Sequence, residues 1–199
     1  MKRHRSLVPL SHDHHDALVQ ARRLQGAGER SDPGTVARAF LRFFAKETVR
    51  HLREEEELVF PAVLDCPAAR EALVQALLEH ERLFALTKLL REALDSGRPV
   101  TPIVQELGEL LVAHVRHEER CLFPLIEGFL DDSTLAAIAL APRGSDSVAD
   151  SPRAPSEVSW KATPTDSNAT LFWGSGGGSH CDAAFLGDRR WDAKDRQPS

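Results

Sequence analysis

The stretch HLREEEELVFPAV, residues 51–63, has a counterpart later in the chain, HVRHEERCLFPLI, residues 114–126. Both copies carry a histidine, a glutamate four residues later and then a Phe-Pro pair in the same register. Because residues four apart lie one turn along the same face of a helix, each copy can present its histidine and its glutamate together. The repeat predicts two similar halves, each able to hold one side of a two-metal site.

The sequence around these copies is typical of helices. Residues 5–140 are rich in Leu, Ala, Glu and Arg, apolar residues recur every three or four positions, and strand-like alternation is nearly absent. The fold class is therefore predicted to be all-α. Short connections between the helices favour antiparallel neighbours. Four long helices are expected to start near Ser11, Asp32-Pro33, Cys66-Pro67 and Thr101-Pro102, with a short fifth from Asp131-Asp132-Ser133 to Leu140.

Two prolines follow the glutamates of the repeat. Pro61 and Pro124 each lie six residues after the glutamate, where a proline removes a backbone donor. They are expected to kink or stop their helices and so to close off the metal-bearing segment in each half.

Residues 141–199 have a different composition. They are rich in Ser, Pro, Asp, Gly and Thr and include the run GSGGGS at 174–179, with too few apolar residues to form a core. They are predicted to be a disordered, low-complexity tail. The tail holds all three tryptophans, so it is either a solvated segment or a docking segment for a protein partner that the sequence does not identify.

Composition argues against several classes of protein. The net charge of -5 is spread along the 199 residues without a basic stripe, so no nucleic-acid partner is expected. No run of about 20 apolar residues is present, so no membrane association is expected, and the N-terminus lacks a secretory apolar stretch. Three widely spaced cysteines without a Cys-x-x-Cys pair suggest a reduced compartment and no ligand role. The expected location is cytoplasmic.

Helical periodicity selects which histidines face inward. His14 shares a face with Leu10, Ala17, Leu18, Ala21 and Leu24, whereas His15 would share its face with Arg22. His80 lies on a stripe with Leu73, Leu77, Leu83, Phe84 and Thr87. His51 and Glu55 continue the stripe of Phe40, Phe44 and Thr48, and His114 and Glu118 continue that of Leu107 and Leu111. His4 and His12 are expected at the surface.

Six buried polar groups need compensation. Two glutamates and four histidines on apolar stripes would be costly without a cation, so the predicted metal ligands are His14, His51, Glu55, His80, His114 and Glu118. Imidazole and carboxylate without thiolate suit iron or manganese and also zinc, and iron is favoured for a bridged pair. His117 is expected to border the site; a supplementary ligand role for it, or for His15, stays open.

These residues resemble the hemerythrin-like, or HHE cation-binding, domain family. The resemblance covers roughly residues 5–130 and rests on LSHDHH at 10–15, EHE at 79–81 and the two His-x-x-x-Glu copies before Phe-Pro. It implies an up-and-down antiparallel four-helix bundle around a non-haem di-iron centre, with the four histidines as terminal ligands and both glutamates bridging. The sequence lacks the second histidine that oxygen-carrying members have one turn from the position of His80, which is more similar to members with four histidines and two glutamates.

The resemblance implies binding of a small ligand. The leading hypothesis is a di-iron protein with an oxo- or hydroxo-bridged centre that binds oxygen, nitric oxide or iron itself in sensing, storage or stress protection, inside a dry pocket built by Phe40, Phe44, Leu77, Phe84 and Leu111. The alternative is a di-iron enzyme with peroxidase-, catalase- or oxidase-like activity on peroxide or oxygen. A helical protein whose tail does the work is a third.

Overall fold

The computed structural model describes residues 3–140, and these form helices joined by short loops, with no β-strand in this range. The predicted all-α class is confirmed for this part of the chain. Residues 141–199, predicted to be a disordered tail, lie outside the described residues.

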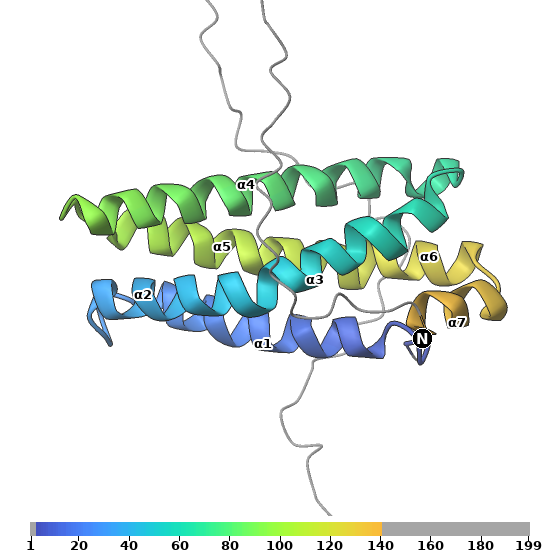
Figure 1. Cartoon of the computed structure of the whole chain (residues 1–199), viewed down its shortest axis with the longest axis horizontal. Helices are drawn as coiled ribbons and strands as arrows, with labels where there is room; N and C mark the ends of the chain where they lie inside the picture. Colours follow the sequence, from blue (N-terminus) through green and yellow to red (C-terminus); the bar gives the residue numbers. More distant parts are fainter. Residues whose placement is uncertain (1–2, 141–199) are drawn as a thin grey trace, which may run out of the picture. The chain divides into compact units, whose positions relative to one another are not determined.

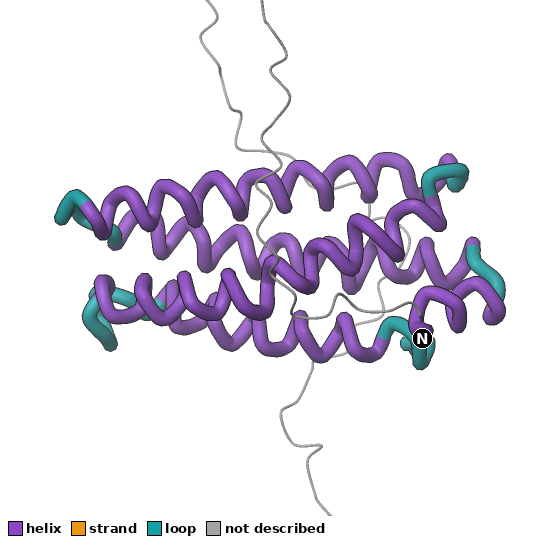
Figure 2. Tube along the Cα trace, viewed as in Figure 1, coloured by secondary structure: helices purple, strands orange, loops and turns teal. Residues whose placement is uncertain are grey.

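Four long helical segments run side by side, and consecutive segments reverse direction (Figure 1). The loops between them are short (Figure 2). The segments are α1 (Val8–Gln25); α2 (Pro33–Phe43) with η1 (Phe44–Thr48), α3 (Val49–Glu54), η2 (Glu55–Val59) and η3 (Phe60–Val63); η4 (Pro67–Ala69) with α4 (Arg70–Asp95); and α5 (Thr101–His117) with η5 (Glu118–Leu122) and α6 (Phe123–Phe129). A short α7 (Asp132–Leu140) follows, close to the expected bounds of the fifth helix.

The helix starts agree with the sequence signals in all but one case. Asp32 caps α2, its Oδ2 accepting the Thr35 backbone N–H at 2.7 Å, and α5 begins at Thr101. The expected start of the first helix near Ser11 is wrong, because α1 begins at Val8. Pro9 then lies in the first turn, where a missing backbone N–H costs nothing.

Widened π-type turns begin at both glutamates of the repeat. The N–H of Phe60 donates to the carbonyl of Glu55, and the N–H of Phe123 donates to the carbonyl of Glu118, each spanning five residues instead of four. Such turns are often found at functional sites. The expectation for Pro124 is wrong, since this proline lies in the first turn of α6 and the helix continues through it. Pro61 lies in η3, after which the segment ends.

The buried apolar side chains form two clusters. One includes Leu24, Phe40, Leu83 and Leu111, and the other includes Leu10, Phe60, Leu73, Phe123 and Ile126. Along α1, α4 and α5 the inward histidines lie between the residues of one cluster and those of the other. A layer of buried polar groups therefore separates two apolar cores.

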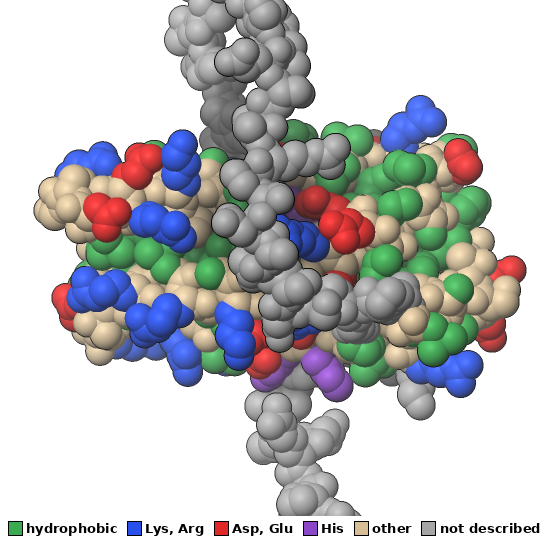
Figure 3. All heavy atoms as spheres, viewed as in Figure 1, with side chains coloured by type: hydrophobic (Ala, Val, Ile, Leu, Met, Phe, Trp, Pro, Cys, Tyr) green, Lys and Arg blue, Asp and Glu red, His purple; other side chains and the backbone are tan. Residues whose placement is uncertain are grey.

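Two members of the expected pocket are not buried. Leu77 is 38% exposed and Phe84 is 40% exposed, whereas Phe40, Phe44 and Leu111 are in the core. The expectation that Leu77 and Phe84 line the pocket is wrong, because the face of α4 that packs inward is narrower than its apolar face. Figure 3 shows hydrophobic side chains on the visible surface between charged side chains of both signs.

Gly108 lets α1 and α5 approach closely. A Cβ atom at this position would lie 2.9 Å from Cγ of Gln25, 3.0 Å from the carbonyl oxygen of Ala21 and 3.1 Å from Cβ of Leu24. Two of these atoms belong to rigid parts of α1, so the helices would have to separate. The close approach holds the inward face of α1 against that of α5.

Gly108→Ala is expected to lower the free energy of unfolding by about 1–3 kcal/mol through overpacking, although alanine is the better helix former. Urea denaturation measures the change. Gly128→Ala in α6 is the matched control: a Cβ there meets nothing within 4 Å, so no loss is expected. Equal effects of the two substitutions would contradict the packing argument.

Candidate metal centre

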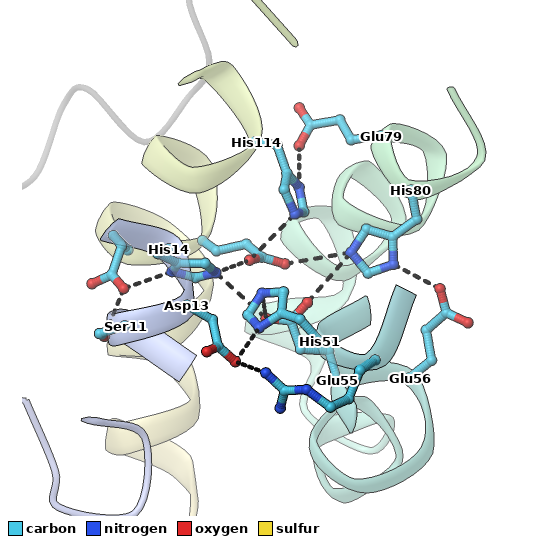
Figure 4. Close-up of polar contacts among 12 residues, drawn as sticks. Ser11, Asp13, His14, His51, Glu55, Glu56, Glu79, His80 and His114 are labelled. Carbon is cyan, nitrogen blue, oxygen red and sulfur yellow. Dashed lines mark hydrogen bonds and ion pairs between the residues drawn. The ribbon is translucent and has the colours of Figure 1, made fainter. Parts of the chain in front are cut away.

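The structure brings all six predicted ligands together. Figure 4 shows the four histidines and Glu55 pointing toward one another. They come from each of the four long segments: α1 supplies His14, α3 and η2 supply His51 and Glu55, α4 supplies His80, and α5 and η5 supply His114 and Glu118. They form two groups that share both glutamates, one with His14 and His51 and the other with His80 and His114. In each group the candidate ligand atoms lie within 4.8 Å of one another.

The Nε2 atoms of the four histidines all face the two carboxylates. Nε2 of His14 is 2.9 Å from Oε2 of Glu118 and 3.6 Å from Oε1 of Glu55. Nε2 of His51 is 3.2 Å from Oε1 of Glu55. On the other side, Nε2 of His80 is 3.5 Å from Oε2 of Glu55 and 3.8 Å from Oε1 of Glu118, and Nε2 of His114 is 3.6 Å from Oε2 of Glu118.

None of these inward atoms has a hydrogen-bond partner in the part of the chain that the structure describes. The four Nε2 atoms and the four oxygens of Glu55 and Glu118 are all buried and unsatisfied. An unsatisfied buried polar atom costs about 1–3 kcal/mol, so this set needs a cation, or protons on the imidazoles, to compensate it. The lone pairs of these nitrogens and oxygens point toward one another without the alignment of hydrogen bonds. As metal ligands, the eight atoms fit cations at two adjacent positions.

Each histidine also has a carboxylate at its outer nitrogen. Nδ1 of His14 is 2.7 Å from Glu119, that of His80 is 2.6 Å from Glu56, and that of His114 is 3.2 Å from Glu79. Nδ1 of His51 is 3.4 Å from Oδ2 of Asp13. An ionised carboxylate only accepts hydrogen bonds, so a histidine bonded to it carries its proton on Nδ1 and leaves Nε2 as a lone pair facing inward.

Sequence reasoning missed most of these outer carboxylates. It gave no role to Asp13, Glu56 or Glu79. A signal was present: each of the four is the sequence neighbour of an inward residue, and each contacts the histidine of a different helical segment. Adjacent helix residues are rotated by about 100°, so the neighbour of an inward ligand faces the next helix.

The phenylalanines of the two Phe-Pro pairs pack on the site. The ring of Phe123 stacks on His14 with centroids 5.3 Å apart, and the ring of Phe60 stacks on His80 at 5.6 Å. Both rings are buried. Each copy of the repeat thus supplies a phenylalanine ring that fixes the plane of one imidazole and excludes water from it.

Burial and charge act against each other on the titratable groups. Burial favours neutral His51, but the Glu55 carboxylate and then Asp13 outweigh it and raise its pKa to about 9. Burial likewise opposes the charge on His80, but Glu118 and Glu55 raise its pKa to about 10. Burial raises the pKa of Glu55, yet His51 and the other histidines hold it well below the usual value. Without metal, protons on His51 and His80 therefore compensate the two glutamates.

The remaining candidate residues lie outside the two groups. His117 is buried and its Nε2–H donates to the carbonyl oxygen of Ala72 at 2.8 Å, so it is a core histidine rather than a rim residue. His15 is half-buried and His12 is exposed, as expected from the stripe on α1. Among the described cysteines, neither Cys66 nor Cys121 belongs to either group.

Glu119 offers a test of the outer carboxylates. It accepts hydrogen bonds from Ser11 and His14, and it pairs with Arg3 at 2.6 Å; burial raises its pKa, but His14, Ser11 and Arg3 lower it to about 2. Glu119→Gln is expected to weaken metal binding by about 10–100-fold, because the amide supports the imidazole of His14 less strongly. Competition with a chelator of known affinity measures this. Glu106→Gln, which alters an exposed pair with Arg82, is expected to leave affinity unchanged.

Comparisons with known proteins give one match. Residues 72–139 match the family model described as Hemerythrin HHE cation binding domain. No curated protein and no solved structure matches the chain. The matched residues include His80, His114 and Glu118, whereas His14, His51 and Glu55 precede them. The resemblance seen in the sequence is thereby confirmed over residues 72–139, which are similar to the hemerythrin HHE cation-binding domain.

Proposed function

We propose that the six converging residues bind two metal ions. His14 and His51 would hold one ion, His80 and His114 the other, and Glu55 and Glu118 would bridge them. The observation that carries the proposal is a set of eight buried atoms without a hydrogen-bond partner among the described residues: two Nε2 atoms in each group and the four oxygens of the glutamates that both groups share. The four outer carboxylates support it, since metal-ligating histidines usually have such a partner on their second nitrogen.

Iron is the proposed metal. The donor set holds four imidazole nitrogens and two carboxylates with no thiolate, which suits iron or manganese, and two shared carboxylates are typical of di-iron sites within helical bundles. Zinc in a structural site would be expected to have a closed tetrahedral set for each ion. The match of residues 72–139 to a cation-binding domain model also supports a bound metal.

The helices are proposed to form one up-and-down antiparallel four-helix bundle spanning residues 5–140. The reversal of direction between consecutive segments supports this, and so do the contacts of α1 with α5 and of α4 with α5 (Figure 1). A bundle explains why ligands from four segments meet in one layer, because inward positions at similar heights along adjacent helices lie close together.

The proposed function is binding of oxygen, nitric oxide or iron itself, in sensing, storage or stress protection. Bound iron would supply the redox chemistry. The chain would hold the imidazoles by their outer carboxylates and exclude water with Phe60, Phe123 and the two apolar clusters. None of the described helices is long and apolar enough to cross a membrane. The cytoplasm is the proposed compartment.

Metal analysis with optical spectroscopy tests this function. Protein reconstituted anaerobically with ferrous iron should hold about two ions per chain, one for each group of ligands. Its absorption spectrum should change on exposure to oxygen or nitric oxide. The size of the change should be proportional to the amount of bound iron. Fewer than about one ion per chain, or no spectral response to either gas, would overturn the proposal. Iron-dependent steady-state consumption of peroxide would instead favour the enzymatic alternative.

A further inference from the structure

Arg3 lies before α1 in the chain and contacts residues of η5 and α6. Its Nη2 donates to Oε2 of Glu119 at 2.6 Å and to the carbonyl oxygen of the same residue at 3.0 Å. Its Nη1 donates to Oε2 of Glu127 at 3.1 Å, and its guanidinium carbon lies 5.0 Å from the ring centroid of Phe123. Three hydrogen bonds and one cation–π contact therefore hold the planar guanidinium in a single orientation.

Two of these contacts are with groups that fix the ring of His14. Oε1 of Glu119 is 2.7 Å from Nδ1 of His14, and the ring of Phe123 stacks on the same imidazole. Arg3 binds the other oxygen of that carboxylate and lies over the ring of that phenylalanine. One side chain therefore contacts both supports of a proposed metal ligand.

The segment that carries Arg3 is itself held in place. The backbone N–H of His4 donates to Oε1 of Glu127 at 2.6 Å, so the carboxylate that binds the guanidinium also binds the main chain beside it. Leu7 is buried in the same apolar cluster as Phe123. A residue can orient a ligand only if packing and hydrogen bonds hold that residue as well, and Arg3 meets this condition.

The other copy of the repeat offers an internal comparison. Glu56, which follows the bridging glutamate there, is 2.6 Å from Nδ1 of His80, and Phe60 stacks on the same imidazole (Figure 4). Among the residues that the structure describes, no lysine or arginine pairs with Glu56, whose side chain is 41% exposed. Arg3 therefore has no counterpart in this half, and it makes two otherwise matched halves of the site unequal.

We propose that Arg3 is a positioning residue for the metal centre, holding Glu119 and Phe123 where they orient the imidazole of His14. The proposal rests on the two-metal function argued above. The charge of Arg3 would act in the opposite direction, because removal of a cation leaves more negative charge near the bound ions and should tighten their binding. The affinity for metal therefore separates positioning from charge.

Cobalt(II) binding to Arg3→Met, measured by competition with a chelator of known affinity, tests the proposal. The dissociation constant of one of the two ions should rise about three- to tenfold, which is less than the effect of losing Glu119 itself, because that carboxylate keeps its bonds to Ser11 and His14. Arg3→Lys keeps the charge but cannot form the planar fork, so its constant should lie between those of the wild type and Arg3→Met. Arg5→Met is the matched control, since it removes an exposed arginine from the same segment, and it should not weaken binding.

A double-mutant cycle shows whether Arg3 acts through Glu119. In a Glu119→Gln background, Arg3→Met should change the dissociation constant by less than about twofold, whereas the effects of independent residues add. Proton NMR of the cobalt-loaded protein gives a second readout. The ring N–H signal of His14, identified as the signal that Glu119→Gln changes most, should shift in Arg3→Met. The signal of His80, identified in the same way with Glu56→Gln, should keep its position.

The variants should keep the helical circular dichroism spectrum of the wild type. Three results would each overturn the positioning role: wild-type or tighter cobalt binding in both Arg3→Met and Arg3→Lys, additive effects in the cycle, or equal changes in the His14 and His80 signals. Two cobalt ions bound per wild-type chain would still uphold the two-metal site in those cases. Wild-type protein that binds no cobalt overturns both proposals.

Discussion

Glu118→Ala is expected to reduce bound iron from about two ions per chain to well under one. Glu118 is shared by both groups of ligands, and its two oxygens face three of the four histidines at 2.9–3.8 Å. In the proposed two-metal site, its loss would remove one ligand from each ion and the carboxylate that bridges them. It also removes half of the central carboxylate charge that attracts a cation to the site. Metal analysis after gel filtration measures the change.

Two further variants make this result specific. Glu118→Gln keeps the size of the side chain and removes its charge, so it is expected to lose metal as well while keeping a helical circular dichroism spectrum. Glu57→Ala removes an exposed carboxylate from the same acidic run as Glu55 and should bind as much iron as the wild type. Full loading of Glu118→Ala, or equal loss in Glu57→Ala, would show that the central carboxylate does not bridge the ions.

Removal of the metal is expected to lower the melting temperature by on the order of 10 °C. An ion that binds only the folded state stabilises it by mass action, by about 4 kcal/mol when its free concentration is a thousand times the dissociation constant. For a folded part of this size, each kcal/mol changes the melting temperature by a few degrees. Calorimetry of the loaded protein with and without a chelator measures the difference; identical curves would argue for a helical fold without a metal role.

The difference in melting temperature between the metal-loaded and the metal-free protein should increase as the pH rises. The pKa values of His51 and His80 in the metal-free fold are about 9 and about 10, above the ordinary value of 6.5 that applies to the unfolded chain. Their protons therefore stabilise the metal-free fold fully below pH 6.5, and this contribution is lost as the pH rises through 9 to 10. Metal replaces those protons, so the loaded form should keep its stability. Melting curves at pH 6.5 and pH 9.5 compare the two.

Much of the fold could be predicted from local sequence patterns. The all-α class and most helix starts follow from the 3.6-residue period, from Asp32-Pro33 and from Thr101-Pro102, because periodicity and capping depend on residues within one or two turns. The same period selected His14 over His15 and His12, whose exposure agrees with it. The early start of α1 and the continuation of α6 through Pro124 were missed, because a proline in a first helical turn and one that breaks a helix look alike in sequence.

The sequence by itself determined that residues 5–140 are helical and that four histidines and two glutamates lie on apolar stripes. Only the tertiary structure decided which groups meet: the division into two ligand groups, and the pairing of Glu119 with His14 and of Glu56 with His80. The reason is physical. A stripe is fixed by the rotation along one helix, whereas a contact between helices depends on their relative height and separation, set by packing such as that at Gly108.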